Sequence, residues 1–180
     1  GDMHIYAGDY SDIKEADVIV ITAGAGQKPG EPRMELVQRN CRIGQSISDS
    51  IMPHYTSGVL LVVANPVDVL TYKYQQWTGL PASRVIGSGT TLDSLRFRYL
   101  LSEHFHIDVQ NVHGYIIGEH GDSQIPAWSA TNISGLPVRD FARVADIALT
   151  DEMCAEIGLQ VKQAADEIIR RKGATYYGVG

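Results

Sequence analysis

The sequence predicts an α/β protein whose N-terminal part forms a parallel sheet. Short runs of β-branched residues alternate with segments of helical periodicity, and such strand–helix–strand repeats form parallel sheets with right-handed crossovers. The first two runs are continuously apolar, which is typical of strands buried on both faces. Ligands bind beyond the carboxyl ends of such strands, so the loops after Ala23, Ala64 and Gly118 are the places to search for functional residues.

The first half of the chain is expected to hold three strands and two helices. The strands are expected over 17–22, 59–64 and 84–86, and the helices over 34–51 and from Asp68 to Trp77. Apolar residues spaced three and four apart predict the first helix, and Pro53 ends it. Asp68 is expected to cap the second helix, and Gly79 and Pro81 stop it.

The second half begins with a turn over 87–91 that leads into a helix. Further elements are expected as helices over 92–104 and from Thr150 or Asp151 to Gly173, and as one strand over 112–118. The last helix keeps apolar residues such as Ile157 and Val161 at helical spacing, and Gly173 stands where a C-terminal stop is expected.

Composition and charge exclude several classes of protein. The chain is 44% hydrophobic and carries a net charge of −6, which is ordinary for a globular domain and argues against a general nucleic-acid binder. No apolar run is long enough to span a membrane, and a signal peptide is not evident. Cys41 and Cys154 lie far apart, which favours two reduced thiols in a cytoplasmic protein over a single disulfide. Gly1 and Gly180 predict that both ends are internal to a longer protein.

Three polar residues could form a catalytic site. His120 lies between Glu119 and Gly121 at the end of an expected strand, and histidine exchanges protons near neutral pH. Asp93 lies in the first turn of a helix, and Arg96 follows three residues later on the same face. Asp93 could therefore hold an imidazole, and Arg96 could bind the carboxylate of a ligand. Each residue also has a simpler explanation. His120 could be a loop histidine that caps another group, Asp93 could only complement the helix dipole, and Asp93 and Arg96 could form a simple intrahelical ion pair.

The segment from Gly24 to Arg33 is either a mobile lid that carries Gln27 and Arg33 or an ordinary loop between strand and helix. It is not a dinucleotide fingerprint, because Pro29 replaces the third glycine. Arg98 is expected on the helix face opposite Arg96, as a surface residue. The remaining histidines fit no common zinc spacing, so no metal site is expected, and the flanks of Ser88 exclude a serine-hydrolase elbow.

Six motifs in register resemble L-lactate dehydrogenase over nearly the whole chain. They are VIVITAG at 18–24, QKPG at 27–30, NPVD at 65–68, GSGTTLDS at 87–94, GEHGDS at 118–123 and KGATYYG at 172–178. The resemblance implies a partial Rossmann-type sheet, an NAD-binding domain at 1–87 with its N-terminal part missing, and the start of an α/β (α+β) substrate domain at 88–180 with its C-terminal part missing.

The resemblance also implies a role for each site residue. His120 would exchange a proton with the pyruvate or L-lactate oxygen, Asp93 would fix the imidazole and favour its charged form, and Arg33 would stabilise charge on the carbonyl oxygen. Arg96 would bind the substrate carboxylate, and Thr175 would line the side-chain pocket. The implied cofactor contacts are Ala23, Gly24, Asn40, Ala64 and Asn65, of which Asn65 also meets the substrate.

The resemblance also bears on substrate choice, through Gln27, and on regulation, through Arg98 and His113. An arginine at the place of Gln27 goes with malate in the superfamily, so a neutral amide favours pyruvate over oxaloacetate. Arg98 and His113 match the pair that binds fructose 1,6-bisphosphate in allosteric bacterial members, which are homotetramers. A malate-type or other 2-hydroxyacid enzyme remains an alternative, and so does a non-catalytic assembly fragment.

The sequence departs from the family pattern in three ways. Pro32 stands where the family usually has Thr or Ser and stiffens the segment before Arg33, whereas Gly26 replaces a commoner Asn and loosens it. The strand and glycine-rich turn that bind the ADP half of NAD in the family are not present. We therefore expect the 180 residues alone to bind NAD weakly or not at all.

Overall fold

The computed structural model describes residues 3–26 and 33–173, without the side chains of Arg33 and Asp166. The chain divides into two compact units, Gly1–Ser88 and Gly89–Gly180, and each unit is described here by itself. The sequence predicted a division after Gly87, one residue earlier.

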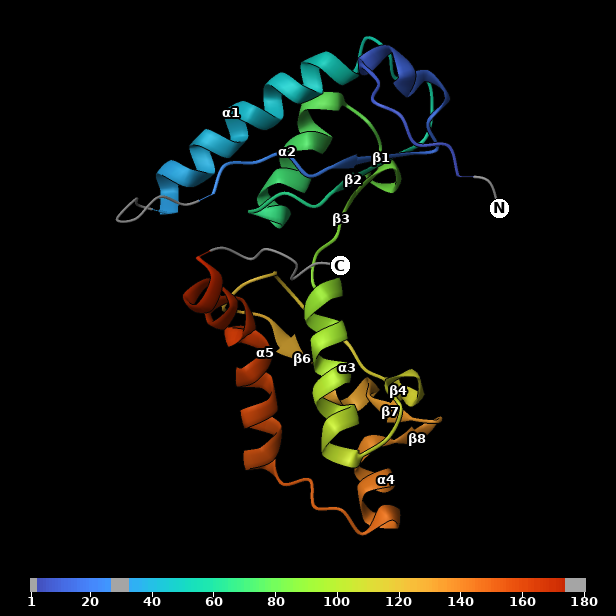
Figure 1. Cartoon of the computed structure of the whole chain (residues 1–180), viewed down its shortest axis with the longest axis vertical. Coiled ribbons are helices and arrows are strands. Elements are labelled where there is room, and N and C mark those ends of the chain that lie inside the picture. The colour runs from blue at the N-terminus through green and yellow to red at the C-terminus, as the bar shows by residue number, and fades with distance from the viewer. Residues whose placement is uncertain (1–2, 27–32, 174–180) are drawn as a thin grey trace. The chain divides into compact units, whose positions relative to one another are not determined.

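The first unit is a three-stranded parallel sheet with two long helices (Figure 1). Its elements are the 3-10 helix η1 (Tyr10–Glu15), strand β1 (Val18–Ile21), helix α1 (Arg33–Ile51), strand β2 (Val59–Val62), helix α2 (Val67–Thr78), the 3-10 helix η2 (Ala82–Arg84) and strand β3 (Val85–Gly87). The strands lie in the order β1-β2-β3, so the carboxyl ends of β1 and β2 are neighbours at one edge of the sheet. The predicted parallel sheet is confirmed.

The two faces of this sheet differ in burial. Leu60 and Val62 of β2 are fully buried, and they form one core with α1 and α2, which lie on the same side of the sheet (Figure 1). On the other face Val18 is 55% exposed, Val20 is 52% exposed and Ile86 is 46% exposed. The prediction that β1 is buried on both faces is therefore wrong for this chain. Both helices pack on one face, and β1 pairs with β2 alone among the described strands.

The second unit combines three helices with short antiparallel strands (Figure 1). Its elements are helix α3 (Thr91–Phe105), the 3-10 helix η3 (Val109–Asn111), strands β4 (Val112–His113), β5 (Ile116–Ile117) and β6 (Ile125–Pro126), the 3-10 helix η4 (Trp128–Ala130), strands β7 (Asn132–Ile133) and β8 (Leu136–Pro137), and helices α4 (Val138–Ala145) and α5 (Asp151–Lys172). Its core centres on Phe97 and Leu101 of α3.

The single strand expected over 112–118 is wrong. The segment forms β4, which pairs with β7, and β5, which pairs with β6 in a different sheet. Gly114 separates them, and a side-chain carbon there would lie 2.8 Å from the Phe97 ring. The backbone therefore passes directly against the core helix at this point, and the strand changes partner there.

The helix ends also test the sequence predictions. The side chain of Thr150 accepts a hydrogen bond from the Met153 N–H at 3.3 Å, and Gly173 ends α5 in the left-handed conformation, as expected. Asp68 does not cap α2, because Pro66 occupies the cap position and Asp68 lies in the first turn. Helix α4 was not predicted from the sequence. It is eight residues long and follows the β7–β8 hairpin directly.

Cys41 and Cys154 are both free thiols. Burial raises the pKa of the Cys154 thiol, although Arg139 opposes the shift. None of the helices within the described residues has the length and apolarity that a membrane span requires. The same residues contain no cluster of metal-binding side chains.

Candidate active site

The second unit holds a close pair between a histidine and a carboxylate. Asp93 lies in the first turn of α3, and His120 lies in the loop that follows β5. His120 Nδ1 lies 2.6 Å from Asp93 Oδ2, and the carboxylate side chain is 3% exposed whereas the imidazole is 29% exposed. A carboxylate accepts from an N–H, so this contact places a proton on Nδ1 and makes Nε2 the atom that can exchange protons.

Arg96 completes a three-residue cluster. It lies one helical turn beyond Asp93, and its Nη1 is 3.5 Å from Asp93 Oδ1, so the two carboxylate oxygens face different cations. That ion pair is longer than a hydrogen bond, and a guanidinium has five N–H donors. Arg96 therefore has donors to offer an anion, and it is 18% exposed. The alternative of an intrahelical ion pair accounts for the Asp93 contact but not for His120.

Two hydroxyl side chains fix β5 against the first turn of α3. Ser94 Oγ accepts a hydrogen bond from the Ile116 N–H at 2.9 Å, and Thr90 Oγ1 donates to the Ile116 carbonyl at 2.6 Å. The contact sets the start of the segment that carries His120. These two residues were not among the expected site residues, although Thr90 stands at the N-cap position of α3 and Ser94 lies in its first turn beside Asp93.

The loop that carries His120 has further anchors. Lys162 of α5 donates to the Asp122 carbonyl at 2.8 Å, and Ser123 Oγ donates to Glu119 Oε2 at 2.7 Å. These contacts connect the loop to a helix about 40 residues further along the chain and close it upon itself. His120 is thus held by its own side chain and by the loop on either side of it.

In the first unit, the residues expected to contact a cofactor gather at the carboxyl ends of β1 and β2. Ala23 and Gly24 follow β1, and Ala64 and Asn65 follow β2. A side-chain carbon on Gly24 would lie 3.5 Å from the Ala64 side chain, so the two loops are close neighbours. Ala23, Gly24 and Asn65 are exposed and offer main chain and one amide to a ligand.

Asn40 lies beneath these loops rather than on their surface. It is 2% exposed, and its amide contacts the main chain of both loops. Gln27 and Thr175 lie outside the described residues, and Arg33 begins α1 with its side chain undescribed. The roles expected for these three residues stay predictions.

Arg98 and His113 lie in one region of the second unit. Arg98 Nε donates to the Gly114 carbonyl at 2.9 Å, and the guanidinium lies 5.2 Å from the centre of the Tyr115 ring. His113 precedes Gly114 on β4 and is exposed. Arg98 was expected as a surface residue, but its side chain donates to the main chain of Gly114, the residue next to His113.

Comparison with protein families assigns both units. Residues 2–87 match the model of the lactate/malate dehydrogenase NAD binding domain, and residues 90–180 match the lactate/malate dehydrogenase alpha/beta C-terminal domain. The chain belongs to the lactate/malate dehydrogenase family. The two family regions meet where the structure divides into its two units. The partial Rossmann-type fold expected from the sequence is confirmed by this family membership.

Several individual members of the lactate/malate dehydrogenase family are closely similar to this chain. L-lactate dehydrogenases from Thermoanaerobacter sp. (strain X514) and Clostridium acetobutylicum are 52% and 50% identical over 98% and 97% of this chain. A crystal structure of a lactate dehydrogenase from a deep-sea metagenome library superimposes with a TM-score of 0.93 at 49% identity, over 99% of this chain and 57% of that one. The minor L-lactate dehydrogenase of Enterococcus mundtii in its ligand-bound form gives 0.88 at 45%, over 95% and 54%. This chain spans 57% and 56% of the two named curated relatives.

Proposed function

We propose that the protein containing this chain is an NAD-dependent L-lactate dehydrogenase that reduces pyruvate to L-lactate. The observation that carries the proposal is the 2.6 Å contact between His120 and the buried Asp93, with Arg96 on the other carboxylate oxygen. A carbonyl reduction needs a proton donor, and a 2-oxoacid needs a cation for its carboxylate. The cluster supplies both within one unit, and the L-lactate dehydrogenase names of the relatives agree with it.

In this reaction NADH supplies the hydride when it is bound. His120 holds a proton at Nε2 and passes it to the carbonyl oxygen, which becomes the hydroxyl of lactate. Asp93 holds the Nδ1 proton and balances the charge of the imidazolium before that transfer. Arg96 binds the substrate carboxylate through paired N–H donors and so orients the carbonyl. Arg33 is proposed to stabilise negative charge on the carbonyl oxygen, and Thr175 to line the pocket for the methyl group.

The first unit fits a dinucleotide at its strand ends. Ala23, Gly24, Ala64 and Asn65 would contact the cofactor; Ala23 and Gly24 are exposed and small and so leave their main chain open to a ligand, Asn65 offers an exposed amide, and Ala64 is buried beside Gly24. Parallel strands bind ligands at this edge, which favours the site over other faces of the unit.

Substrate choice is assigned to Gln27. A neutral amide would leave the second carboxylate of oxaloacetate without a cation in a closed pocket, which costs more than placing the pyruvate methyl group there. Gln27 therefore favours lactate dehydrogenase over a malate-type enzyme.

We further propose that fructose 1,6-bisphosphate activates the enzyme by binding Arg98 and His113 in a cytoplasmic homotetramer. The Arg98 contact with Gly114 supports this idea, because it keeps the guanidinium close to the strand that carries His113. An arginine and a histidine that both reach the same phosphate can bind it.

The deciding experiment is steady-state kinetics of the protein that contains this chain. Pyruvate and oxaloacetate are compared as substrates with NADH, each with and without fructose 1,6-bisphosphate. We expect pyruvate to have the higher kcat/KM and the sugar bisphosphate to lower its KM. An Arg98→Ala variant should keep the unactivated rate and lose the activation. Preference for oxaloacetate would contradict the role of Gln27, and pyruvate reduction without activation would remove the allosteric site alone.

A further inference from the structure

Asn40 is a buried residue that connects the two loops at the carboxyl ends of β1 and β2. Asn40 lies on α1, and its side chain is 2% exposed. Its Oδ1 accepts a hydrogen bond from the Ala25 N–H at 2.8 Å. Its Nδ2 donates to the Ala25 carbonyl at 3.1 Å and to the Asn65 carbonyl at 2.7 Å. The amide therefore uses both of its N–H donors and its oxygen within the protein.

The pattern of these contacts fixes which way the amide faces. Nδ2 lies against two carbonyl oxygens, and Oδ1 lies against one N–H, so the reverse orientation would place an oxygen against two oxygens. Asn40 and Ala25 form a two-point contact of the kind that paired strands make, and the Asn65 carbonyl adds a third point. A carboxylate of the same shape would lose both donors and meet two carbonyl oxygens instead.

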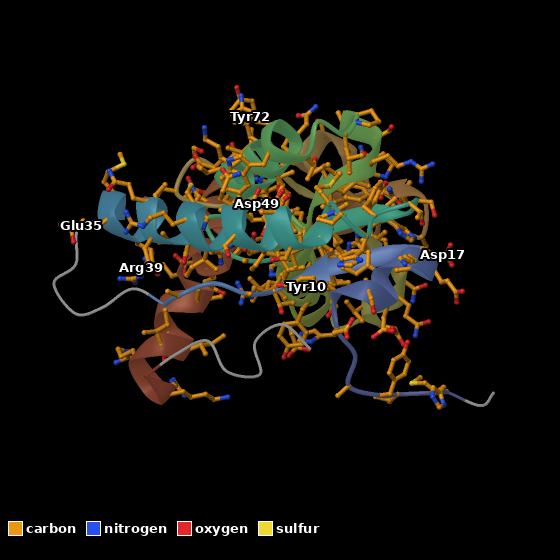
Figure 2. The ribbon with its side chains drawn as sticks, turned by 90° about the horizontal axis from the view of Figure 1, so that it is seen from above. Tyr10, Asp17, Glu35, Arg39, Asp49 and Tyr72 are labelled. Carbon is orange, nitrogen blue, oxygen red and sulfur yellow. The ribbon has the colours of Figure 1, made fainter. Side chains whose placement is uncertain are left out.

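Neighbouring contacts reinforce this arrangement. Arg39 Nη2 donates to the Gly26 carbonyl at 2.7 Å, and Figure 2 shows Arg39 projecting from α1. A side-chain carbon on Gly24 would lie 3.7 Å from Asn40 Nδ2, so the loop passes directly over the amide. Beyond Asn40, the Asn65 side-chain oxygen accepts from the Val67 N–H at 3.3 Å, which ties that loop to the start of α2.

We propose that Asn40 is a positioning residue, which sets the distance between the loop after β1 and the loop after β2 without contacting the ligand itself. This inference rests on the proposed function, because it takes the exposed Gly24 and Asn65 as cofactor contacts. It replaces the expectation that Asn40 binds the cofactor directly. Since the amide has no N–H left to donate, its effect on cofactor affinity passes through Ala25 and Asn65.

The first test is amide hydrogen exchange of the Ala25 N–H in the unmodified protein. The N–H donates to a side chain that is almost fully buried, so its exchange should be at least about 100-fold slower than that of an unprotected amide. Exchange at the unprotected rate would overturn the proposal. This measurement needs neither substrate nor activity, so it stays valid if pyruvate proves not to be the substrate.

The second test compares Asn40→Asp with Gln38→Glu, the same amide-to-carboxylate change at an exposed position of the same helix. Well below its Tm, Asn40→Asp should raise the NADH Kd and the KM for pyruvate about tenfold each, with a smaller change in kcat, because buried hydrogen bonds that hold the binding loops are lost. Gln38→Glu should change neither. A folded Asn40→Asp protein with both constants within twofold of the original would overturn the proposal, and so would an equal effect of Gln38→Glu.

If Asn40→Asp does not fold, Asn40→Ser takes its place, because the shorter hydroxyl cannot reach both loops. The same rise in NADH Kd is expected, and an unchanged Kd overturns the proposal. The proposed function fails separately, when the unmodified protein binds NADH but does not reduce pyruvate.

Discussion

The two units hold their loops with the same kind of contact but present different chemistry. In the first unit a buried side chain of α1, Asn40, bonds the main chain of two loops at the ends of parallel strands. In the second unit Ser94 of α3 and Thr90, at the N-cap position of that helix, bond the main chain of β5. The first unit then presents small residues and a neutral amide to a ligand, whereas the second presents the charged pair of Asp93 and His120. Under the proposed function, the first unit binds the cofactor and the second transfers the proton.

The largest expected effect tests this division directly. Replacing His120 by glutamine removes the proton donor and should lower kcat for pyruvate reduction by about 10²–10⁴-fold. The Kd for NADH, measured by fluorescence titration, should stay within about twofold, because the contacts that we assign to the cofactor lie in the other unit. A large rise in Kd, or a kcat within tenfold of the original, would break the comparison.

The two faces of the sheet in the first unit give the next prediction. Leu60→Ala creates a cavity in a fully buried position and should lower the free energy of unfolding by about 2–5 kcal/mol. Val20→Thr keeps a β-branched residue at a position that is 52% exposed, and should change it by about 0.5 kcal/mol or less. Urea unfolding of the two variants measures both values. A comparable loss for Val20→Thr would mean that this face is covered in the whole protein.

Ser94 tests whether the second unit depends on its hydroxyl contacts. Ser94→Ala leaves the Ile116 N–H without its partner inside the core, which should cost about 1–3 kcal/mol and reduce kcat through the displaced loop of His120. Ser102→Ala is the matched control, since Ser102 is buried on the same helix but donates to the Tyr99 carbonyl and leaves no N–H unpaired. Thermal unfolding and kcat are measured together. Equal losses for the two variants would contradict the role of Ser94.

The smallest effect separates the two thiols. Burial raises the pKa of Cys154, so a smaller fraction of this residue is thiolate at pH 8 than is usual for a cysteine. Alkylation by iodoacetamide should therefore be about tenfold slower at Cys154 than at the more exposed Cys41, and its rate should continue to rise at a higher pH. Mass spectrometry of tryptic peptides measures both rates, and the denatured chain serves as the control. Equal rates in the folded protein would contradict the burial.

The sequence predicted the elements that have a clear local pattern. Helices α1, α3 and α5 and the three parallel strands agree with the structure within about two residues, because helical spacing of apolar residues marks the helices and short continuous apolar runs mark the strands. In the second unit the two-residue strands were not predicted. The β7–β8 hairpin had a local signal, since Ser134 and Gly135 both have positive φ and form its turn, but two-residue strands carry no periodicity.

The site was predicted in part. Asp93, Arg96 and His120 are brought together as the motifs suggested, because two of them share a helical turn and the third follows a strand on the same core. The sequence did not indicate the roles of Ser94 and Thr90, and it did not indicate that Asn40 is buried beneath the two loops. Their importance comes from hydrogen bonds to main-chain atoms far along the sequence, and a side-chain motif does not encode those partners.

The position of the Asp93–His120 pair along the chain has a consequence for how such proteins would change through recombination. Asp93 and His120 lie 27 residues apart, and they and the hydroxyls that hold β5 lie on one side of the boundary between Ser88 and Gly89. A genetic crossover at that boundary would move the acid–base pair as one inherited block. Gln27, to which we assign substrate choice, would stay with the other parent. The proposed proton chemistry would then be inherited separately from the part of substrate choice that we assign to Gln27.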